Sequence, residues 1–498
     1  MVFNSNDKDE TSKMPTNSEY YSEYKSPPIW EFWRARRYVV TFMLFLGFIN
    51  TYCLRVNLSV AIVAMTQYYN VTLANGTTIV TRDFDWDTKI QGYLLSSFFY
   101  GYIFTQFIGA YLGIRFGGKI VFAVGIGMAS ILTILTPVAA YLNVYLLLVV
   151  RILEGLFEGV IIPCSQTIWT NWAPKLERSR LITIAISGTY IGTVICLPLS
   201  AQLATHLGWE SIFYVFGAVG CLWCVFWLWL IKDSPTEDSK ISNEELKYIT
   251  NSLEGYKGDT SRNIPVWSII TSPPVWALIV ASSSEIWGFY TLLTQLPKFM
   301  KYALKFNLSD SGFVSALPYV AVTFVVQIAG HLGDYVQSKN VFTVGQLRKI
   351  FLGVGFSFQC TFMIISVHWV STVTTTFCLV LAIAFGGFAM AGFAVNNLDL
   401  SPNYASIIVG IANTFATLPG IISPILTGYL VTDETSIEQW RIIFYIAGGI
   451  YLIGGLFYCI FGSGDLQPWD KIPGDLKETA KETYVNPNFQ SEENIPKS

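Results

Sequence analysis

Four of the charged side chains inside long apolar stretches of this sequence form the main candidate group. Arg55 lies late in one stretch, and Arg151, Glu154 and Glu158 lie together in another. Spacings of three and seven residues place the last three side chains on one face of a helix. A charge inside hydrocarbon costs roughly 3 kcal/mol on insertion scales, so such residues indicate a functional site.

These residue types suit an anionic ligand and a bound proton. The planar guanidinium groups of Arg55 and Arg151 match the oxygens of a carboxylate or phosphate. Burial favours the neutral form of a carboxylic acid and a nearby arginine favours its charged form, so Glu154 and Glu158 are candidates for ion coupling. Three alternatives remain open: Arg151 pairs with a glutamate of its own stretch, Arg55 extends its charge to the membrane surface, or a permanent ion pair locks the helices.

Other polar residues in apolar stretches are weaker candidates. Glu285 could be a further ion-coupling residue, or it could bind a polar neighbour or cavity water. Several uncharged residues could contact a substrate, although polar side chains in membranes often only join helices. These residues are Asn57, Ser187, Tyr190, Asn396, Asn397 and Asn413.

The composition requires that these residues be positioned in a membrane. The chain has 498 residues, of which 52% are hydrophobic and 13% are charged, whereas a soluble domain carries about 25% charged residues. The lipid bilayer is therefore an expected partner. The net charge is -3, and without a basic patch no nucleic acid partner is expected.

A helix needs about 20 largely apolar residues to cross a bilayer. The runs are long and continuous and lack the alternation of a membrane barrel, which favours helices. The sequence predicts an all-α, polytopic membrane protein with twelve transmembrane helices. The predicted spans are 38–65, 90–112, 119–141, 145–167, 181–204, 210–232, 273–297, 309–332, 349–369, 371–395, 404–431 and 441–463.

The loops predict that both termini are cytosolic. Lysines and arginines near the span ends gather on the side of the termini, with Lys298, Lys301 and Lys305 as exceptions. The loop after the first span carries two glycosylation patterns, at Asn70 and Asn75, which require an extracellular or lumenal loop.

Short sequence echoes suggest that the two halves are related. Residues 209–214 resemble residues 440–445, and Pro198 and Pro424 interrupt corresponding spans. Two pseudo-symmetric six-helix bundles are a transporter plan with the substrate site between them. We therefore predict a cytosolic N-terminal tail at residues 1–37 and an N-terminal six-helix bundle at 38–232. A cytosolic linker at 233–272 leads to a C-terminal six-helix bundle at 273–463 and a cytosolic C-terminal tail at 464–498.

The sequence shows no enzyme chemistry. It has no phosphate-binding loop, zinc ligand set or nucleophile elbow, so we expect no enzyme activity, no metal and no cofactor other than a co-transported proton or sodium ion. Cys221 and Cys224 have redox spacing but lack the strand and helix of a thioredoxin-like site, so core packing is expected.

Several motifs together resemble one transporter family. Residues 55–61 (RVNLSVA), 97–102 (SFFYGY), 151–159, 172–180, 396–406 and 463–469 (SGDLQPW) occur in order along the chain. They resemble the anion transporter family that contains sialin, the vesicular glutamate transporters and the type I sodium-phosphate cotransporters, within the major facilitator superfamily. The chain looks most similar to invertebrate sialin-like or inorganic phosphate cotransporters.

The resemblance implies a rocking-bundle anion transporter. It implies that Arg55 and Arg151 bind substrate and that Glu154 and Glu158 couple protons. The superfamily pattern Gly-x-Leu-x-Asp is intact up to Asp334, which with Arg178 is expected to act in gating. The vesicular glutamate transporters carry a histidine where this chain has Leu95 and an arginine where it has Glu285, which disfavours glutamate loading.

We therefore expect a secondary active symporter that moves inorganic phosphate or a small organic anion, coupled to sodium or protons. The alternatives are a proton-coupled, sialin-like exporter of acidic sugars from lysosomes and an uncoupled anion channel on the same scaffold. The protein is expected to be a monomer in the plasma membrane or in a lysosomal or vesicular membrane.

Overall fold

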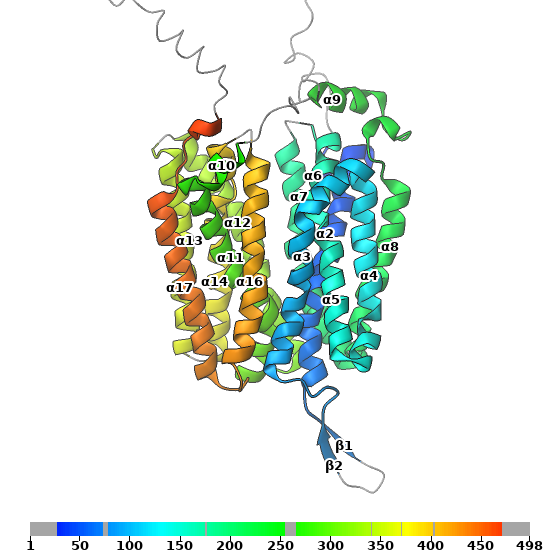
Figure 1. The fold of residues 1–498 in the computed structure, drawn as a ribbon, viewed down its shortest axis with the longest axis vertical. Helices are drawn as coiled ribbons and strands as arrows, with labels where there is room; N and C mark the ends of the chain where they lie inside the picture. Colours follow the sequence, from blue (N-terminus) through cyan, green and yellow to red (C-terminus); the bar gives the residue numbers. More distant parts are fainter. Residues whose placement is uncertain are drawn as a thin grey trace, which may run out of the picture.

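The computed structural model describes residues 27–72, 78–174, 177–253, 265–339, 341–369, 371–401 and 404–470. Within these residues the chain is almost entirely helical, and one two-stranded hairpin is its only sheet. The long helices run side by side along a common axis (Figure 1). The predicted all-α fold is therefore confirmed.

The first half contains six spans, of which the fourth is built from two shorter helices. Its helices are η1 (Ile29–Arg34), α2 (Arg36–Thr66), α3 (Thr88–Phe116), α4 (Gly118–Leu142), α5 (Val144–Glu158), α6 (Ile161–Trp172), α7 (Arg178–Leu207) and α8 (Glu210–Leu230).

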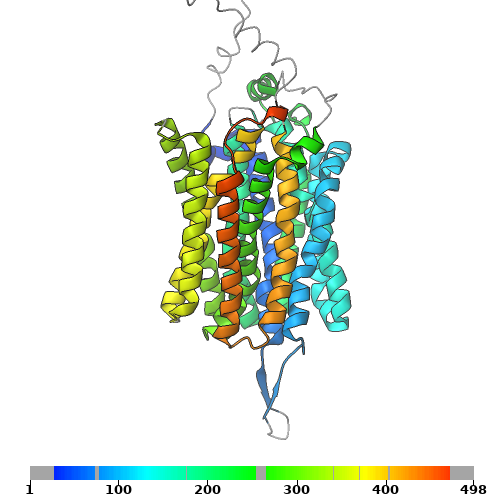
Figure 2. The ribbon, with the colours of Figure 1, turned by 60° about the vertical axis from the view of Figure 1, so that its left-hand side comes forward.

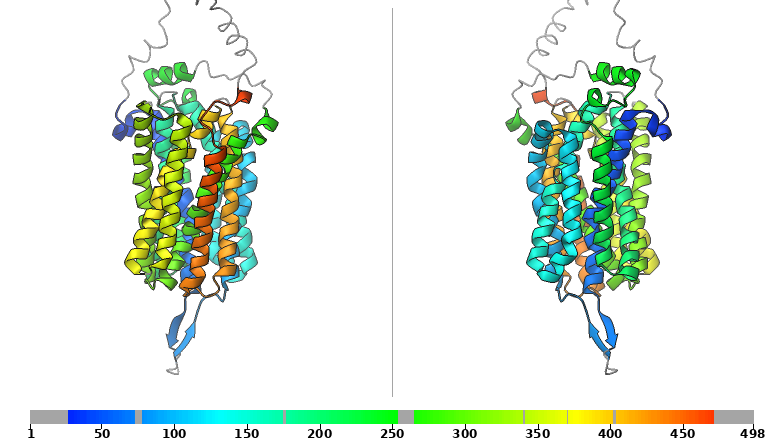
Figure 3. Two further views of the ribbon diagram at one scale, coloured as in Figure 1. Left: turned by 90° about the vertical axis from the view of Figure 1, so that its left-hand side faces the viewer. Right: turned by 90° about the vertical axis from the view of Figure 1, so that its right-hand side faces the viewer.

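A hairpin and a linker helix lie at opposite ends of the bundle. The strands β1 (Tyr69–Thr72) and β2 (Thr78–Thr81) pair antiparallel and project from one end, here named the hairpin end. The linker forms η2 (Pro235–Glu237), α9 (Asn243–Leu253) and α10 (Val266–Ile270) at the other end, here named the linker end. All views agree on this placement (Figures 2 and 3).

The second half repeats the plan of six spans. Its helices are α11 (Pro273–Lys298), η3 (Phe299–Ala303), α12 (Leu308–Ser338), α13 (Val344–His368), α14 (Thr372–Phe393), α15 (Asn396–Leu400), α16 (Ala405–Leu430), α17 (Ile437–Phe461) and η4 (Pro468–Asp470).

The twelve predicted spans all coincide with helices. In the described part of the chain, nine helices are long and apolar enough to cross a membrane by length and composition alone. The remaining spans are α3, α11 and the pair α5 and α6. The fourth span is interrupted at Gly159 and Val160, so each of its pieces is short.

Local sequence sets several helix ends. Asp87 accepts a hydrogen bond from the backbone of Ile90 at 2.8 Å and so caps α3, and Asn143 caps α5 in the same way. Gly117 and Gly208 have φ angles of 88° and 87° where one span turns directly into the next. A side chain would be strained there, so glycine permits these tight connections.

The two halves are joined at the hairpin end. Contacts between halves pair α3 with α16, α7 with α12, and α2 with α11. Thr88 Oγ1 donates to the backbone oxygen of Gly428 at 2.8 Å, and Gln202 Nε2 donates to Ser309 Oγ at 2.6 Å. Lys301 Nζ also reaches across the halves to Gln67 Oε1. The structure is thus closed at the hairpin end.

At the linker end, α9 completes the first half. The residue before α2 is Ala35, whose side chain cannot cap the helix. Glu245 of α9 instead accepts hydrogen bonds from the backbone of Arg36 at 2.9 Å and of Arg37 at 3.1 Å. Its Oε1 also accepts from Nη1 of the fully buried Arg37 at 2.9 Å, while Arg37 Nε donates to Glu177 at 2.8 Å. A carboxylate at a helix N-terminus is stabilising, so α9 closes this end of α2.

Candidate functional site: a buried arginine–glutamate cluster

The fourth span presents its charged residues on one buried face. Arg151, Glu154 and Glu158 are exposed by only 2%, 1% and 1%. Gly155 and Gly159 let α5 approach α3, because a side-chain carbon at either position would overlap a backbone oxygen, that of Phe98 or Tyr102. The predicted spacing on one face is therefore confirmed, and the glycines bring that face against α3.

Arg55 of α2 joins this face. Its Nη2 forms an ion pair with Glu158 Oε2 at 3.2 Å, and its Nη1 donates to Tyr290 Oη at 3.5 Å. Tyr290 belongs to α11, so the guanidinium lies at the contact between the halves. The rings of Tyr52, Phe98 and Tyr102 face its Cζ at 4.9, 4.8 and 4.6 Å. Such aromatic faces attract a desolvated cation and hold it in place.

Arg151 is held in a second pair. Its Nη1 pairs with Glu154 Oε2, and its Nη2 donates to the backbone oxygen of Arg55 at 3.5 Å. The other oxygen of Glu154 accepts hydrogen bonds from Thr133 and Thr136 of α4, both at 3.2 Å. In this conformation Arg151 therefore pairs with a glutamate of its own span, which is one of the alternatives that the sequence left open.

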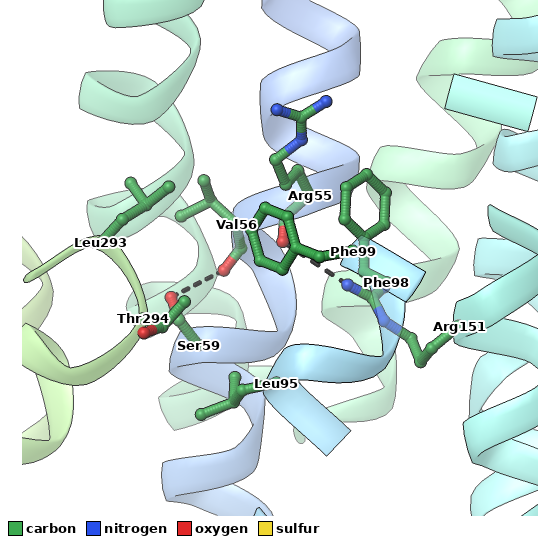
Figure 4. A pocket seen from close by; sticks show the side chains of 9 residues that line it. All are labelled: Arg55, Val56, Ser59, Leu95, Phe98, Phe99, Arg151, Leu293 and Thr294. Atoms are coloured by element: carbon green, nitrogen blue, oxygen red, sulfur yellow. Dashed lines mark hydrogen bonds between the residues drawn. The ribbon is translucent and has the colours of Figure 1, made fainter. Parts of the chain in front are cut away.

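A small cavity adjoins both arginines (Figure 4). It is lined by the two arginines, two hydroxyl side chains and an apolar wall: Arg55, Arg151, Ser59, Thr294, Val56, Leu95, Phe98, Phe99 and Leu293. Figure 4 shows the Arg55 guanidinium pointing away from that of Arg151, which reaches toward the Arg55 backbone. Three buried polar atoms of the cluster, Arg55 Nε, Arg151 Nε and Glu158 Oε1, have no hydrogen-bond partner among the described residues. Because buried polar atoms are normally paired, these atoms are free to bind a ligand or water.

The other predicted substrate contacts are spread over the structure. Asn57 is fully buried on α2, and neither polar atom of its amide has a partner within the described ranges. Tyr190 Oη of α7 donates to Met390 Sδ of α14 at 3.0 Å and so bridges the halves. Asn413 is half-buried on α16. Asn396 lies at the linker end, where its Nδ2 donates to the backbone oxygen of Ser463 at 2.9 Å.

The remaining predicted residues lie outside the cluster. Glu285 is buried in the second half, where its Oε1 accepts from Gln359 Nε2 at 3.3 Å. Arg178 starts α7 and donates to the backbone of Ala173 at 3.4 Å. Asp334 belongs to α12, but its side chain lies outside what the structure describes. Asn70 is exposed in β1, and Asn75 falls outside the described residues.

Sequence reasoning missed the aromatic residues around Arg55. Tyr52 precedes Arg55 by three residues, and Phe98 and Tyr102 are four residues apart in the second span. Such spacings place side chains on one helix face and were a usable signal. Tyr290 could not have been identified in this way, because its contact with Arg55 depends on how α11 packs against α2.

Comparisons with known proteins place the chain in a family. Residues 40–424 match the family model described as Major Facilitator Superfamily. Human sialin is 39% identical over 453 residues, covering 87% of this chain and 91% of sialin. Bovine vesicular glutamate transporter 1 is 39% identical over 92% of this chain and 82% of its own length.

Solved structures share the fold at low sequence identity. A bacterial homolog of the human lysosomal transporter Spinster, in an inward-facing and occupied conformation, aligns with a TM-score of 0.67 at 17% identity over 88% of this chain and 97% of that chain. A D-xylose–proton symporter aligns with a TM-score of 0.64 at 13% identity over 86% of this chain and 99% of that one. This chain is therefore a multi-pass membrane transporter of the Major Facilitator Superfamily, and it belongs with sialin and the vesicular glutamate transporters.

Proposed function

We propose that the protein is a secondary active symporter that moves a small anion together with protons by alternating access. The observation that carries the proposal is the pair of buried arginine–glutamate ion pairs, Arg55 with Glu158 and Arg151 with Glu154. They adjoin a cavity at the contact between the two halves. Midplane sites between two bundles are where such transporters bind their substrates.

The net charge of the cluster favours coupled binding of an anion and a proton. Two arginines and two glutamates sum to zero charge, which suits a medium of low dielectric constant. An anion that enters alone leaves an uncompensated buried charge, which is strongly unfavourable. A proton that binds Glu158 restores neutrality and releases Arg55 to the anion. The cluster therefore carries one proton together with the anion.

Proton coupling is a better fit than sodium coupling at this cluster. Both carboxylates of the cluster, Glu154 and Glu158, are already paired with guanidinium groups, which repel a metal cation. A proton binds covalently to one oxygen and needs no cage of oxygen ligands. Sodium coupling remains the alternative that the experiment below tests.

The proposed substrate is inorganic phosphate or a small organic anion. Two guanidinium groups with two hydroxyl side chains nearby suit the oxygens of either ligand. The names of the relatives, sialin and vesicular glutamate transporter, support the organic anion. They also support a lysosomal or vesicular location, and the plasma membrane is the other candidate location. Asn57, Tyr190, Asn396 and Asn413 are the proposed additional substrate contacts, and Arg178 and Asp334 the proposed gating residues.

The proposed topology places the hairpin outside the cytosol. Asn70 is exposed on the hairpin within a glycosylation pattern. The linker end carries α9 and most of the basic loops, which favours the cytosol for that end and for both termini. One chain encloses the whole cluster, so the proposed transporter acts as a monomer.

Uptake into liposomes by the purified full-length protein tests this function. Labelled phosphate and labelled sialic acid are offered with a pH gradient and a sodium gradient imposed separately. We expect accumulation of one anion above its equilibrium level under the pH gradient alone. Accumulation that requires sodium would refute proton coupling, and movement only down the anion's own gradient would indicate a channel.

Variants of the cluster assign the roles. Arg55→Ala is expected to raise KM by roughly 10- to 100-fold, since a hydrogen bond to a charged group contributes about 1.5–3 kcal/mol. Glu158→Gln is expected to abolish the pH-driven accumulation that this cluster contributes while anion exchange continues. Arg115→Ala, at an exposed position of α3, is the control and should transport like the wild type. Normal uptake by Arg55→Ala would remove the substrate site from this cluster.

A further inference from the structure

A second buried carboxylate lies in the C-terminal half, away from the arginine cluster. Glu285 lies near the middle of α11, Gln359 near the middle of α13 and Tyr451 near the middle of α17. Gln359 Nε2 donates to Glu285 Oε1 at 3.3 Å and to Tyr451 Oη at 3.4 Å. Three helices thus bring one acid, one amide and one phenol together in the centre of the bundle.

Glu285, Gln359 and Tyr451 are all buried, and glycines of neighbouring helices make room for them. Glu285 is 7% exposed, Gln359 is 1% exposed and Tyr451 is 2% exposed. Gly386 of α14 faces Glu285, and Gly288 of α11 faces Tyr451. A side-chain carbon at either glycine would overlap the Glu285 carboxylate or the Tyr451 hydroxyl. The two glycines therefore leave the space that the Glu285 carboxylate and the Tyr451 hydroxyl occupy.

Two atoms of the group lack partners. Glu285 Oε2 and Gln359 Oε1 are buried and accept no hydrogen bond from any described residue. An ionised carboxylate in this setting is expensive, because a buried charge needs an opposite charge and several donors. Glu285 accepts a hydrogen bond from one amide donor, and in the described ranges it forms no ion pair with a lysine or arginine.

The surrounding titratable groups do not supply a positive charge. Those that face the Glu285 group are phenols and one thiol: Tyr451 from α17, Tyr319 from α12, Cys360 from α13 and Tyr190 from α7. From α14 the nearest group is Gly386, and the α16 helix contains no acidic or basic residue. From α2, which also packs against α11, Arg55 contacts Tyr290 and is paired with Glu158.

We propose that Glu285, with Gln359 and Tyr451, is a proton-binding site of the C-terminal half that is separate from the Arg55 cluster. This inference rests on the proposed function, because it concerns a second proton carried in the same transport cycle. The proton comes from water and forms an O–H bond with Glu285 Oε2. Release returns it to water and leaves the carboxylate.

Gln359 can serve both charge states of the acid. Its NH₂ group donates to the carboxylate, as it does here, and its carbonyl oxygen would accept from the protonated acid after the amide turns over. The oxygen and nitrogen of an amide are assigned from their hydrogen bonds, and both orientations fit the same space. A glutamine is therefore a suitable partner for an acid that changes its protonation state during transport.

Access to Glu285 depends on the opposite half. Tyr190 of α7 packs edge-on against Phe289, one turn beyond Glu285, with ring centroids 6.4 Å apart. Its hydroxyl donates to Met390, one turn beyond Gly386. Tyr190 thus covers the region of Glu285 from the N-terminal half, and movement between the halves would withdraw it. Water would then reach Glu285 and take up its proton.

Glu285 and the residue that contacts the Arg55 cluster lie on different faces of α11. Tyr290, which contacts Arg55, follows Glu285 by five residues, which is about 140° around a helix. Tyr290 packs on Phe99 of the first half, at 4.6 Å between ring centroids, whereas Glu285 faces Gln359 of the second half. A change at Glu285 should therefore leave anion binding at Arg55 intact.

The test uses the full chain and the isosteric variant Glu285→Gln, with Glu438→Gln at an exposed position of α17 as the matched control. Infrared difference spectra across a pH titration of the purified protein report the carbonyl band of a protonated carboxylic acid without requiring transport. We expect wild type and Glu438→Gln to show the same buried-acid band and Glu285→Gln to lack one component of it. An unchanged spectrum in Glu285→Gln would overturn the proposal, as would a band that disappears when sodium ions are added.

Transport stoichiometry provides the second readout. Liposomes at zero membrane potential receive a gradient of one pH unit and whichever labelled anion, phosphate or sialic acid, the wild type accumulates. Each coupled proton contributes about a factor of ten to the equilibrium accumulation, so Glu285→Gln should accumulate about tenfold less than wild type and Glu438→Gln should match it. Equal accumulation by Glu285→Gln would overturn the proposal. If the wild type accumulated neither anion, the proposed function would fail, while the infrared result would still decide whether Glu285 binds a proton.

Discussion

Replacing Glu245 should destabilise the N-terminal half more than any other change on α9. Glu245 accepts two backbone hydrogen bonds from the start of α2 and one from the Arg37 guanidinium, at 2.9, 3.1 and 2.9 Å. Both charged side chains are almost fully buried, at 0% and 2% exposure. Removing one partner of a buried ion pair costs about 3–5 kcal/mol.

The expected loss of unfolding free energy depends on which contacts each substitution retains. Arg37 keeps Glu177 at 2.8 Å, so Glu245→Ala should cost about 3 kcal/mol for the ion pair and about 1 kcal/mol for the lost cap. Glu245→Gln keeps an oxygen that can cap α2 but loses the charge, so about 2 kcal/mol is expected. Glu244→Ala is the control, because Glu244 is exposed on the same helix.

The assay is the apparent melting midpoint of purified protein in detergent, followed by the monomer peak in size-exclusion chromatography after heating. A change of 1 kcal/mol shifts the midpoint of a unit of this size by about 2–4 °C. Glu245→Ala should therefore melt roughly 8–16 °C below the wild type, Glu245→Gln roughly half as far below, and Glu244→Ala at the wild-type midpoint. If Glu245→Ala melted together with Glu244→Ala, α9 would not close the end of α2 in the way described.

Three further predictions concern other parts of the chain. Gly155→Ala should reduce both transport and melting midpoint, because its new carbon meets the backbone oxygen of Phe98, whereas Gly353→Ala has open space and should resemble the wild type in both assays. Burial lowers the pKa of Lys301, in η3 beyond the seventh span, to about 8, against the opposing effect of Glu434. Between about pH 8 and the usual lysine pKa of 10.5, Lys301 therefore binds fewer protons in the folded protein than in the unfolded chain. The contribution of Lys301 to the free energy of unfolding then rises with pH in that window. The melting midpoint of wild type relative to Lys301→Met should rise over the same range, and a constant difference would contradict the assignment. Asn70→Gln expressed in eukaryotic cells should run at a lower apparent mass than the wild type on a gel, and glycosidase treatment should reduce the difference. If the wild type is glycosylated and Asn70→Gln runs with it, the sugar is attached elsewhere.

The sequence predicted the helices well, because each span is a long apolar run with polar residues at its ends. It also predicted that Arg151, Glu154 and Glu158 share one face, since that depends only on helical periodicity. The pairing of Arg55 with Glu158 could not be predicted, because nothing in a single span tells which other span packs beside it. The role of Glu245 could not be predicted either. A polar linker has the same sequence pattern whether its charged residues face water or cap the end of another helix, as Glu245 does for α2.

The position of Glu245 has a consequence for how the protein is made. Its hydrogen bond to the backbone of Arg36 joins residues 209 positions apart in the chain. At about 5–20 residues per second, the ribosome synthesises that interval in roughly 10–40 s. During this time the first span has entered the membrane while its leading amide groups still depend on water or lipid headgroups. Biogenesis of the N-terminal half is therefore complete only when the linker has left the ribosome, and a nascent chain released before residue 245 would carry an unfinished first helix.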